Sequence, residues 1–199
     1  MDDQHFCGEG SHGDSLQTQT LRAVLRRRGF NPSGELCDIE DALAFGADAL
    51  GAGLVPAHTV LACEQRTQRC FFLRRDETGQ AEAFIALLYL NRAGYEALMF
   101  GRFNAEEPDL AHLAGPDDTA LAIYVWCLAG ATPQAKRAVV RAVTEARRKA
   151  FPDIALFARP VTREGRMMTA ALDAPGAGAA WLGWVPARQG EPETVGEGV

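Results

Sequence analysis

The stretch ALAIYVWCLAGATPQAKRAVVRAVTEARRKA, residues 120–150, decides the fold of this chain. Its first ten residues, 120–129, are nearly all apolar and lack the polar alternation of a strand with one face in water. We therefore expect a strand that is buried on both faces of a sheet. Thr132 can then cap a helix and Pro133 suits its first position, so a helix is predicted over 133–150.

The predicted helix has a basic surface. The residues at helical spacing that should face the core are Ala135, Val139, Val143, Ala146 and Ala150. The basic residues that should point mostly outward are Lys136, Arg137, Arg141, Arg147, Arg148 and Lys149. Such a surface is ordinarily a solvated face, and it becomes an anion site only if Lys136 and Arg137 converge on one ligand.

Elements of alternating type surround this unit. Capping residues and apolar periodicity predict helices at 14–28, 38–50, 91–100 and 162–172. Short β-prone runs predict strands at 59–63, 70–74, 83–90, 154–158 and 181–185, with turns at 31–34 and 76–79 and a surface connection at 104–118. The order of these elements predicts an α/β (α+β) fold, with a mixed central sheet flanked by helices.

Length and charge bound the kind of protein. A chain of 199 residues suits one domain, which we place at 14–187 between flexible tails at 1–13 and 188–199. The formal charge of −6 gives no reason to expect nucleic acid or an anionic membrane as a partner. The start is acidic and polar, unlike a secretory signal, and no apolar run is long enough to span a bilayer. A soluble, cytoplasmic protein is therefore expected.

The five cysteines are odd in number and not closely paired, which favours reduced thiols over a disulfide framework. Cys127 would be a nucleophile only if its thiolate were stabilised, and a buried strand cysteine is usually inert. His5, Cys7 and His12 lie close together, but their segment is rich in Gly and Ser. We interpret that segment as a tail and expect no metal site.

Over roughly residues 59–187 the order of elements resembles the GNAT acyltransferase superfamily. In that family the strand that corresponds to 120–129 splays from its neighbour and holds the pantetheine of acyl-CoA. The N-terminus of the next helix binds the pyrophosphate, since free amides and the helix dipole favour an anion there. The resemblance implies acetyl-CoA or acyl-CoA as co-substrate, bound by Leu128, Ala129, Gly130, Gln134, Ala135, Lys136, Arg137 and Arg141.

The resemblance also implies a reaction in which an amine of a small molecule or a protein attacks the thioester. Tyr124 is then a candidate acid near the thioester, or else an ordinary core residue. His58 is a candidate base, because an imidazole suits amine deprotonation near neutral pH, or else a loop histidine. Glu164 could act as a base through water, or simply favour the dipole of its helix. Whether the chain forms a homodimer is left open.

A narrower similarity concerns bacterial toxin-activating lysine acyltransferases, which lack the glycine loop of the GNAT superfamily and use an N-terminal histidine. The order of FLRRD at 72–76, then Phe84, a helix near 92–101 and Trp126 is similar to theirs. In this similarity His58 would take the place of the histidine.

The chain departs from the GNAT pattern at two places. The signature loop Q/R-x-x-G-x-G/A would begin at Gln134, and Arg137 then stands where the first glycine belongs. The C-terminal tyrosine of the family should fall near Leu172 and is absent. Two alternatives follow: a catalytically inactive GNAT-like protein that binds a ligand or partner, and an interaction module that uses 104–118 or the basic helix.

Overall fold

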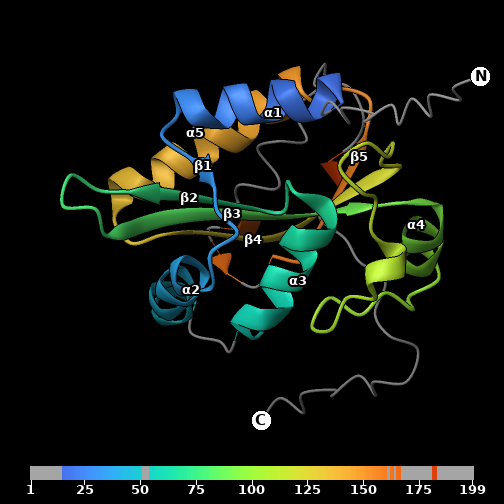
Figure 1. Cartoon of the computed structure of the whole chain (residues 1–199), viewed down its shortest axis with the longest axis horizontal. Coiled ribbons are helices and arrows are strands. Elements are labelled where there is room, and N and C mark those ends of the chain that lie inside the picture. The colour runs from blue at the N-terminus through green and yellow to red at the C-terminus, as the bar shows by residue number, and fades with distance from the viewer. Residues whose placement is uncertain (1–14, 51–53, 161, 164, 167–180, 183–199) are drawn as a thin grey trace, which may run out of the picture.

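The computed structural model describes residues 15–50, 54–160, 162–163, 165–166 and 181–182. One sheet runs through this part of the chain, with helices on both of its faces (Figure 1). The elements, in chain order, are α1 (Leu16–Arg27), β1 (Asn31–Pro32), α2 (Leu36–Leu50), α3 (Ala57–Thr67), β2 (Phe71–Arg75), β3 (Ala81–Leu90), α4 (Arg92–Met99), the 3-10 helix η1 (Leu110–His112), β4 (Ala122–Gly130), α5 (Pro133–Lys149), β5 (Ala155–Ala158) and β6 (Trp181–Leu182). The predicted fold class is confirmed.

The sheet is mixed, and its strands follow one another in chain order from β1 to β6. Neighbouring strands from β1 to β4 are antiparallel, whereas β5 runs parallel to β4 and β6 runs parallel to β5. A tight turn can join antiparallel strands, and the one at 76–79 joins β2 to β3 as predicted. A parallel pair needs a crossover, which α5 supplies between β4 and β5.

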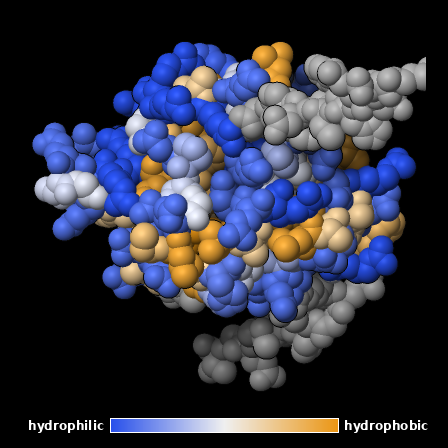
Figure 2. Space-filling view, viewed as in Figure 1, coloured by the Kyte–Doolittle hydropathy of each residue, from blue (hydrophilic) through white to orange (hydrophobic). Residues whose placement is uncertain are grey.

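The helices are divided between the two faces of the sheet. In Figure 1, α1 and α5 lie together on one face, while α2 and α3 lie on the other. Side chains of the strands alternate between the two faces of the sheet, so that Phe72 and Ile85 pack in a cluster under α1 and α5 while Phe71 and Phe84 pack in a cluster against α2 and α3. Hydrophilic side chains cover most of the face shown in Figure 2, with hydrophobic residues between them. The helices that the structure describes include none long and apolar enough to cross a membrane.

The junction between β4 and α5 forms as predicted. Thr132 caps the helix, and its Oγ accepts a hydrogen bond of 3.1 Å from the Ala135 N–H, while Pro133 occupies the first helical position. The first turn of α5 packs directly on Gly130. A Cβ added to Gly130 would lie 2.6 Å from the Lys136 backbone nitrogen, so only glycine lets the helix approach the end of the strand this closely.

Most of the other predicted elements are present within a few residues of their expected bounds, but three expectations are wrong. The strand at 59–63 lies inside α3, where Val60, Cys63, Glu64 and Thr67 are buried at helical spacing. The turn at 31–34 contains the short strand β1, which pairs with β2. Arg147 does not point outward: it is 1% exposed and donates to the backbone oxygens of Phe151 and Pro152, where α5 has ended.

Several predicted segments lie outside the described residues. The two tails, most of the helix at 162–172 and residues 183–185 of the last strand are among them. The second predicted helix, α2, begins at Leu36 rather than at 38.

The contact at Gly130 predicts a large effect of a small substitution. Replacing Gly130 with alanine should lower the free energy of unfolding by about 2 kcal/mol, because the new methyl group overlaps helix backbone that cannot move independently of α5. Urea denaturation followed by circular dichroism measures this change.

Gly34→Ala is the matched control, since a Cβ at Gly34 would meet only the Glu64 Cγ, at an ordinary 3.8 Å. Its effect should stay within about 0.5 kcal/mol. Equal effects of the two substitutions would contradict the close packing of α5 on Gly130.

Candidate functional site

Strand β4 is paired on one side along its whole length and on the other side along only half of it. It pairs with β3 from Ala122 to Gly130, whereas its last pair with β5 is Val125 with Ala158. Within the described ranges, no strand pairs with residues 126–130 on the β5 side. We call this side of residues 126–130 the open edge of β4.

A β-bulge marks the point where the open edge begins. Val125 is opposite Leu87 and Cys127 is opposite Ala86, so Trp126 is an extra residue in β4. Bulges bend a strand and increase its twist, which turns β4 away from a straight course beside β5. Residues 126–128 are half-buried, while the rest of the strand is buried. The Trp126 indole N–H donates to the Ala105 backbone oxygen at 2.8 Å, which holds that side chain in place.

The register determines which backbone groups face the open edge. The Ala131 N–H donates to the Glu82 oxygen at 2.8 Å, and antiparallel residues alternate between hydrogen-bonded and non-bonded positions. Ala129 therefore directs its N–H toward β3, while Leu128 and Gly130 direct their backbone groups toward the open edge. Of the three strand residues predicted to hold a thioester, two present their amides to that side and Ala129 does not.

Most amides in the first turn of α5 are already bonded within the helix and its cap. The Ala135 N–H donates to Thr132 Oγ, and the Lys136 N–H donates to the Thr132 backbone oxygen at 2.9 Å. Pro133 has no N–H, and Arg137 lies inside the regular helix. Of this turn, only the Gln134 N–H is left to face a ligand. The resemblance had implied that residues 134–137 would all bind the ligand.

The predicted basic residues of α5 do not all lie on one face, although Arg137 and Arg141, four residues apart, are neighbours on the helix surface. Lys136, Arg137 and Arg141 are all exposed. Five residues along an α-helix correspond to a rotation of about 140°, so Lys136 and Arg141 lie on different flanks of α5. Arg141 lies on the flank toward α1, where it lines a pocket together with Ala138. One phosphate group cannot contact both side chains in this arrangement.

Tyr124 lies two residues before Trp126, the extra residue of the bulge. It is 5% exposed, and its ring packs against Phe103 with the centroids 5.6 Å apart. Burial raises the pKa of the Tyr124 hydroxyl, and the nearby positive charge of Arg159 acts in the opposite direction. The hydroxyl therefore stays protonated at neutral pH, so it can donate a proton but cannot act as a base.

The other predicted catalytic residues do not join Tyr124. His58 is exposed on the first turn of α3, whose buried Val60 packs in the cluster beside α2, whereas Tyr124 belongs to the cluster beside α4. Glu164 lies outside the described residues. Burial raises the pKa of the Cys127 thiol to about 12, which leaves it protonated and inert as a nucleophile at neutral pH.

A buried polar cluster escaped the sequence analysis. Arg69 is fully buried, and its guanidinium lies over the Tyr89 ring, 4.4 Å from the centroid. It donates to Thr18 Oγ1 at 2.9 Å and to the backbone oxygens of Gly115 and Asp118 at 2.9 and 3.0 Å. These bonds tie the start of β2 to α1 and to the segment before β4, so this arginine has a structural role.

Glu64 anchors the same strand. One carboxylate oxygen accepts hydrogen bonds from the Cys70 and Phe71 N–H groups, at 2.7 and 2.9 Å. Burial raises the pKa of Glu64 to about 7, although both amides and the charge of Arg22 act to lower it. The helical spacing of Glu64 with Val60 and Thr67 was the sequence signal that could have placed this carboxyl in the core.

The part of the chain that the structure covers contains no group of three His, Cys, Asp or Glu side chains arranged to hold a metal ion. His5, Cys7 and His12 lie outside that part. No protein-family model, curated protein or solved structure matches the chain.

Glu64 predicts a pH dependence of stability. Its folded pKa of about 7 is above the ordinary value of 4.5, so the folded state holds the proton more tightly than the unfolded state. Stability should therefore fall as pH rises from about 4.5 through 7, by about 3 kcal/mol in total, and then level off. Urea denaturation at a series of pH values measures this contribution.

Glu64→Gln is the control, because its amide oxygen can still accept the two backbone hydrogen bonds but does not titrate. The difference in stability between the wild type and this variant should change across that pH range. A constant difference would show that Glu64 is not the titrating group.

Proposed function

We propose that this protein binds an acyl thioester along the open edge of β4 and transfers the acyl group to an amine. The observation that carries the proposal is the unequal pairing of β4, which ends with β5 at Val125 but continues with β3 to Gly130. The resemblance to the GNAT superfamily supports it, since that family binds acyl-CoA beside such a strand. The cytoplasm is the compartment we propose, in keeping with the free cysteines of the described residues.

The open edge suits the pantetheine part of a thioester. Pantetheine is an extended chain with two amides, and an extended chain can bind a strand edge through backbone hydrogen bonds. Leu128 and Gly130 face that side, and the half-buried side chains of Trp126 and Leu128 can shield apolar parts of the ligand. An amide from Leu128 can donate to the thioester carbonyl, whose oxygen gains negative charge during attack.

The reaction assigns one role to a described side chain. The amine nitrogen attacks the carbonyl carbon, the carbon–sulfur bond breaks, and the thiolate leaves with the electron pair. Tyr124 is protonated and lies just before the open edge of β4. It can therefore give its proton to the thiolate and recover one from the amine through solvent. His58 is exposed on α3 whereas Tyr124 is buried beside α4, so we give His58 no role.

The non-catalytic alternative has an observation of its own. The first turn of α5 uses two of its amides in the cap, and His58 is exposed on α3 whereas Tyr124 is buried in the cluster beside α4. Both observations fit a protein that keeps a thioester-like ligand site without turnover. Binding and acylation must therefore be measured separately.

An NMR titration tests the binding step at single residues. Acetyl-CoA, a longer acyl-CoA and an S-acyl-pantetheine should each shift the backbone amide signals of Leu128 and Gly130, with dissociation constants below about 1 mM. If none of the three ligands binds at that concentration, the proposal is wrong.

Two substitutions at one position isolate the amide. Leu128→Ala keeps the N–H, whereas Leu128→Pro removes an N–H that faces away from β3 and so leaves the ladder intact. The proline variant should bind the thioester at least about tenfold more weakly than the alanine variant. Equal affinities of the two folded variants would contradict binding of the thioester along the open edge.

Acylation of a panel of amines then separates the two alternatives. In the catalytic case Tyr124→Phe should slow the reaction by about a hundredfold while thioester affinity is kept. Binding without acylation of any amine in the panel would favour the ligand-binding protein.

A further inference from the structure

A cationic pocket lies on the flank of α5 that faces α1, away from the open edge of β4. Its walls are the arginines at positions 27, 28, 74, 75 and 141, and its volume is about 450 Å³. We call it the arginine pocket. We infer that the arginine pocket is a second ligand site, which binds a small molecule through a diphosphate or triphosphate group.

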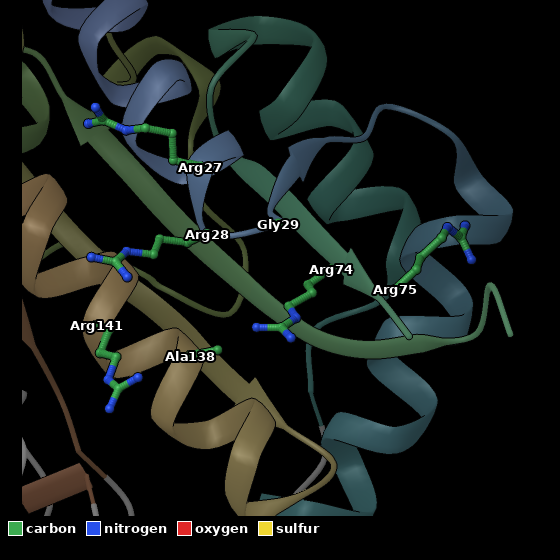
Figure 3. A pocket seen from close by; sticks show the side chains of 7 residues that line it. All are labelled: Arg27, Arg28, Gly29, Arg74, Arg75, Ala138 and Arg141. Atoms are coloured by element: carbon green, nitrogen blue, oxygen red, sulfur yellow. The ribbon is translucent and has the colours of Figure 1, made fainter. Parts of the chain in front are cut away.

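Three separate elements build the arginine pocket. Arg28 follows the end of α1, Arg74 lies on β2, and Arg141 projects from α5. Figure 3 shows the side chains of these three residues around one hollow, while Arg75 points away from it. Residues this distant in sequence meet only in the fold, so their gathering is not a consequence of one basic run.

Small residues keep the hollow open. Ala138 and Gly29 line it, and neither has a side chain long enough to fill it. Gly29 has φ +83°, and a Cβ there would lie 3.7 Å from the Arg74 side chain, so the stem of Arg74 packs against this glycine. The volume of the pocket is within the range of small-molecule sites.

The positive charge of the pocket exceeds the negative charge that pairs with it. Glu145 pairs with Arg27 and Arg28, Glu82 pairs with Arg74 at 2.6 Å, and Asp38 pairs with Arg75. Three carboxylates thus meet five guanidiniums, and among the described residues no carboxylate pairs with Arg141. Among the described residues, two of the five guanidinium charges are thus not offset by a paired carboxylate, in a chain whose net charge is −6.

The paired arginines are also held in position to bind an anion. The Arg74 side chain is 25% exposed and is fixed between Gly29 and Glu82. A guanidinium has five N–H donors, and a carboxylate uses at most two of them, so donors are left for a ligand. An ion pair of this kind holds the arginine side chain in position and leaves the pocket open to a ligand.

The chemistry of the walls favours phosphate. Guanidinium groups match pairs of phosphate oxygens in a planar fork, and they are weakly hydrated, which lowers the cost of binding. The pocket is larger than one phosphate, and the arginines around it lie on three elements. A chain of two or three phosphates carries enough charge and oxygens to reach all three, whereas a single carboxylate does not.

Calorimetry on the full chain at low salt tests this inference, with inorganic pyrophosphate and ATP as ligands and inorganic phosphate for comparison. Pyrophosphate and ATP should bind with dissociation constants below about 1 mM, at least about fivefold more tightly than phosphate, and more weakly as salt rises. Absence of pyrophosphate and ATP binding at that concentration would overturn the inference.

Arg141→Gln should weaken pyrophosphate binding at least about tenfold, and its fold should be kept because Arg141 is exposed and pairs with no carboxylate of the described residues. Arg92→Gln is the matched control: it removes the same charge from a side chain on α4 that is 84% exposed. Equal losses in the two variants would mean general charge attraction and would contradict a specific pocket.

The same variants decide whether the arginine pocket is separate from the open edge. S-acyl-pantetheine has no phosphate, so its binding should be the same in Arg141→Gln and in the wild type. Acyl-CoA binding at the open edge, followed by the Leu128 and Gly130 amide signals, should have the same affinity within about twofold in both proteins. A tenfold loss of that affinity in Arg141→Gln would show that the pocket belongs to the thioester site and would overturn the inference of a second site.

Discussion

The unequal pairing of β4 is the constraint on which the candidate site depends. A central strand normally satisfies its backbone groups on both sides, because a buried N–H or C=O without a partner costs free energy. Here β3 pairs with β4 as far as Gly130, while β5 stops at Ala158, opposite Val125. The bulge at Trp126 and the close contact of α5 with Gly130 fix the strand beyond that point, so its open edge is held in place with no second strand beside it among the described residues.

The parts of this arrangement that were predictable have local causes. The apolar run of β4 has no other stable place than a buried sheet, and Thr132 and Pro133 specify the start of α5 through a cap and a fixed φ. Asn91 caps α4 in the same way, and its side chain accepts from the Gly94 N–H at 3.0 Å. Each of these signals acts within four residues, where sequence patterns are most informative.

The errors have non-local or competing causes. The run at 59–63 is β-prone, but burial of Val60, Cys63 and Glu64 against β2 and β3 requires the helical period. Arg147 is placed in the core by the packing of α5, because the carbonyl oxygens of Phe151 and Pro152 offer it partners there. The bulge, the end of the β4–β5 pairing and the arginine pocket join segments far apart in the sequence, and no short spacing could have revealed them.

Hydrogen exchange at three consecutive residues tests the central claim most directly. The N–H of Ala129 bonds to β3, whereas the N–H groups of Leu128 and Gly130 face the open edge. In the ligand-free protein the Leu128 and Gly130 amides should exchange at least about tenfold faster than the Ala129 amide. Equal protection of all three would mean that β4 is paired on both sides, and it would contradict the site proposed here.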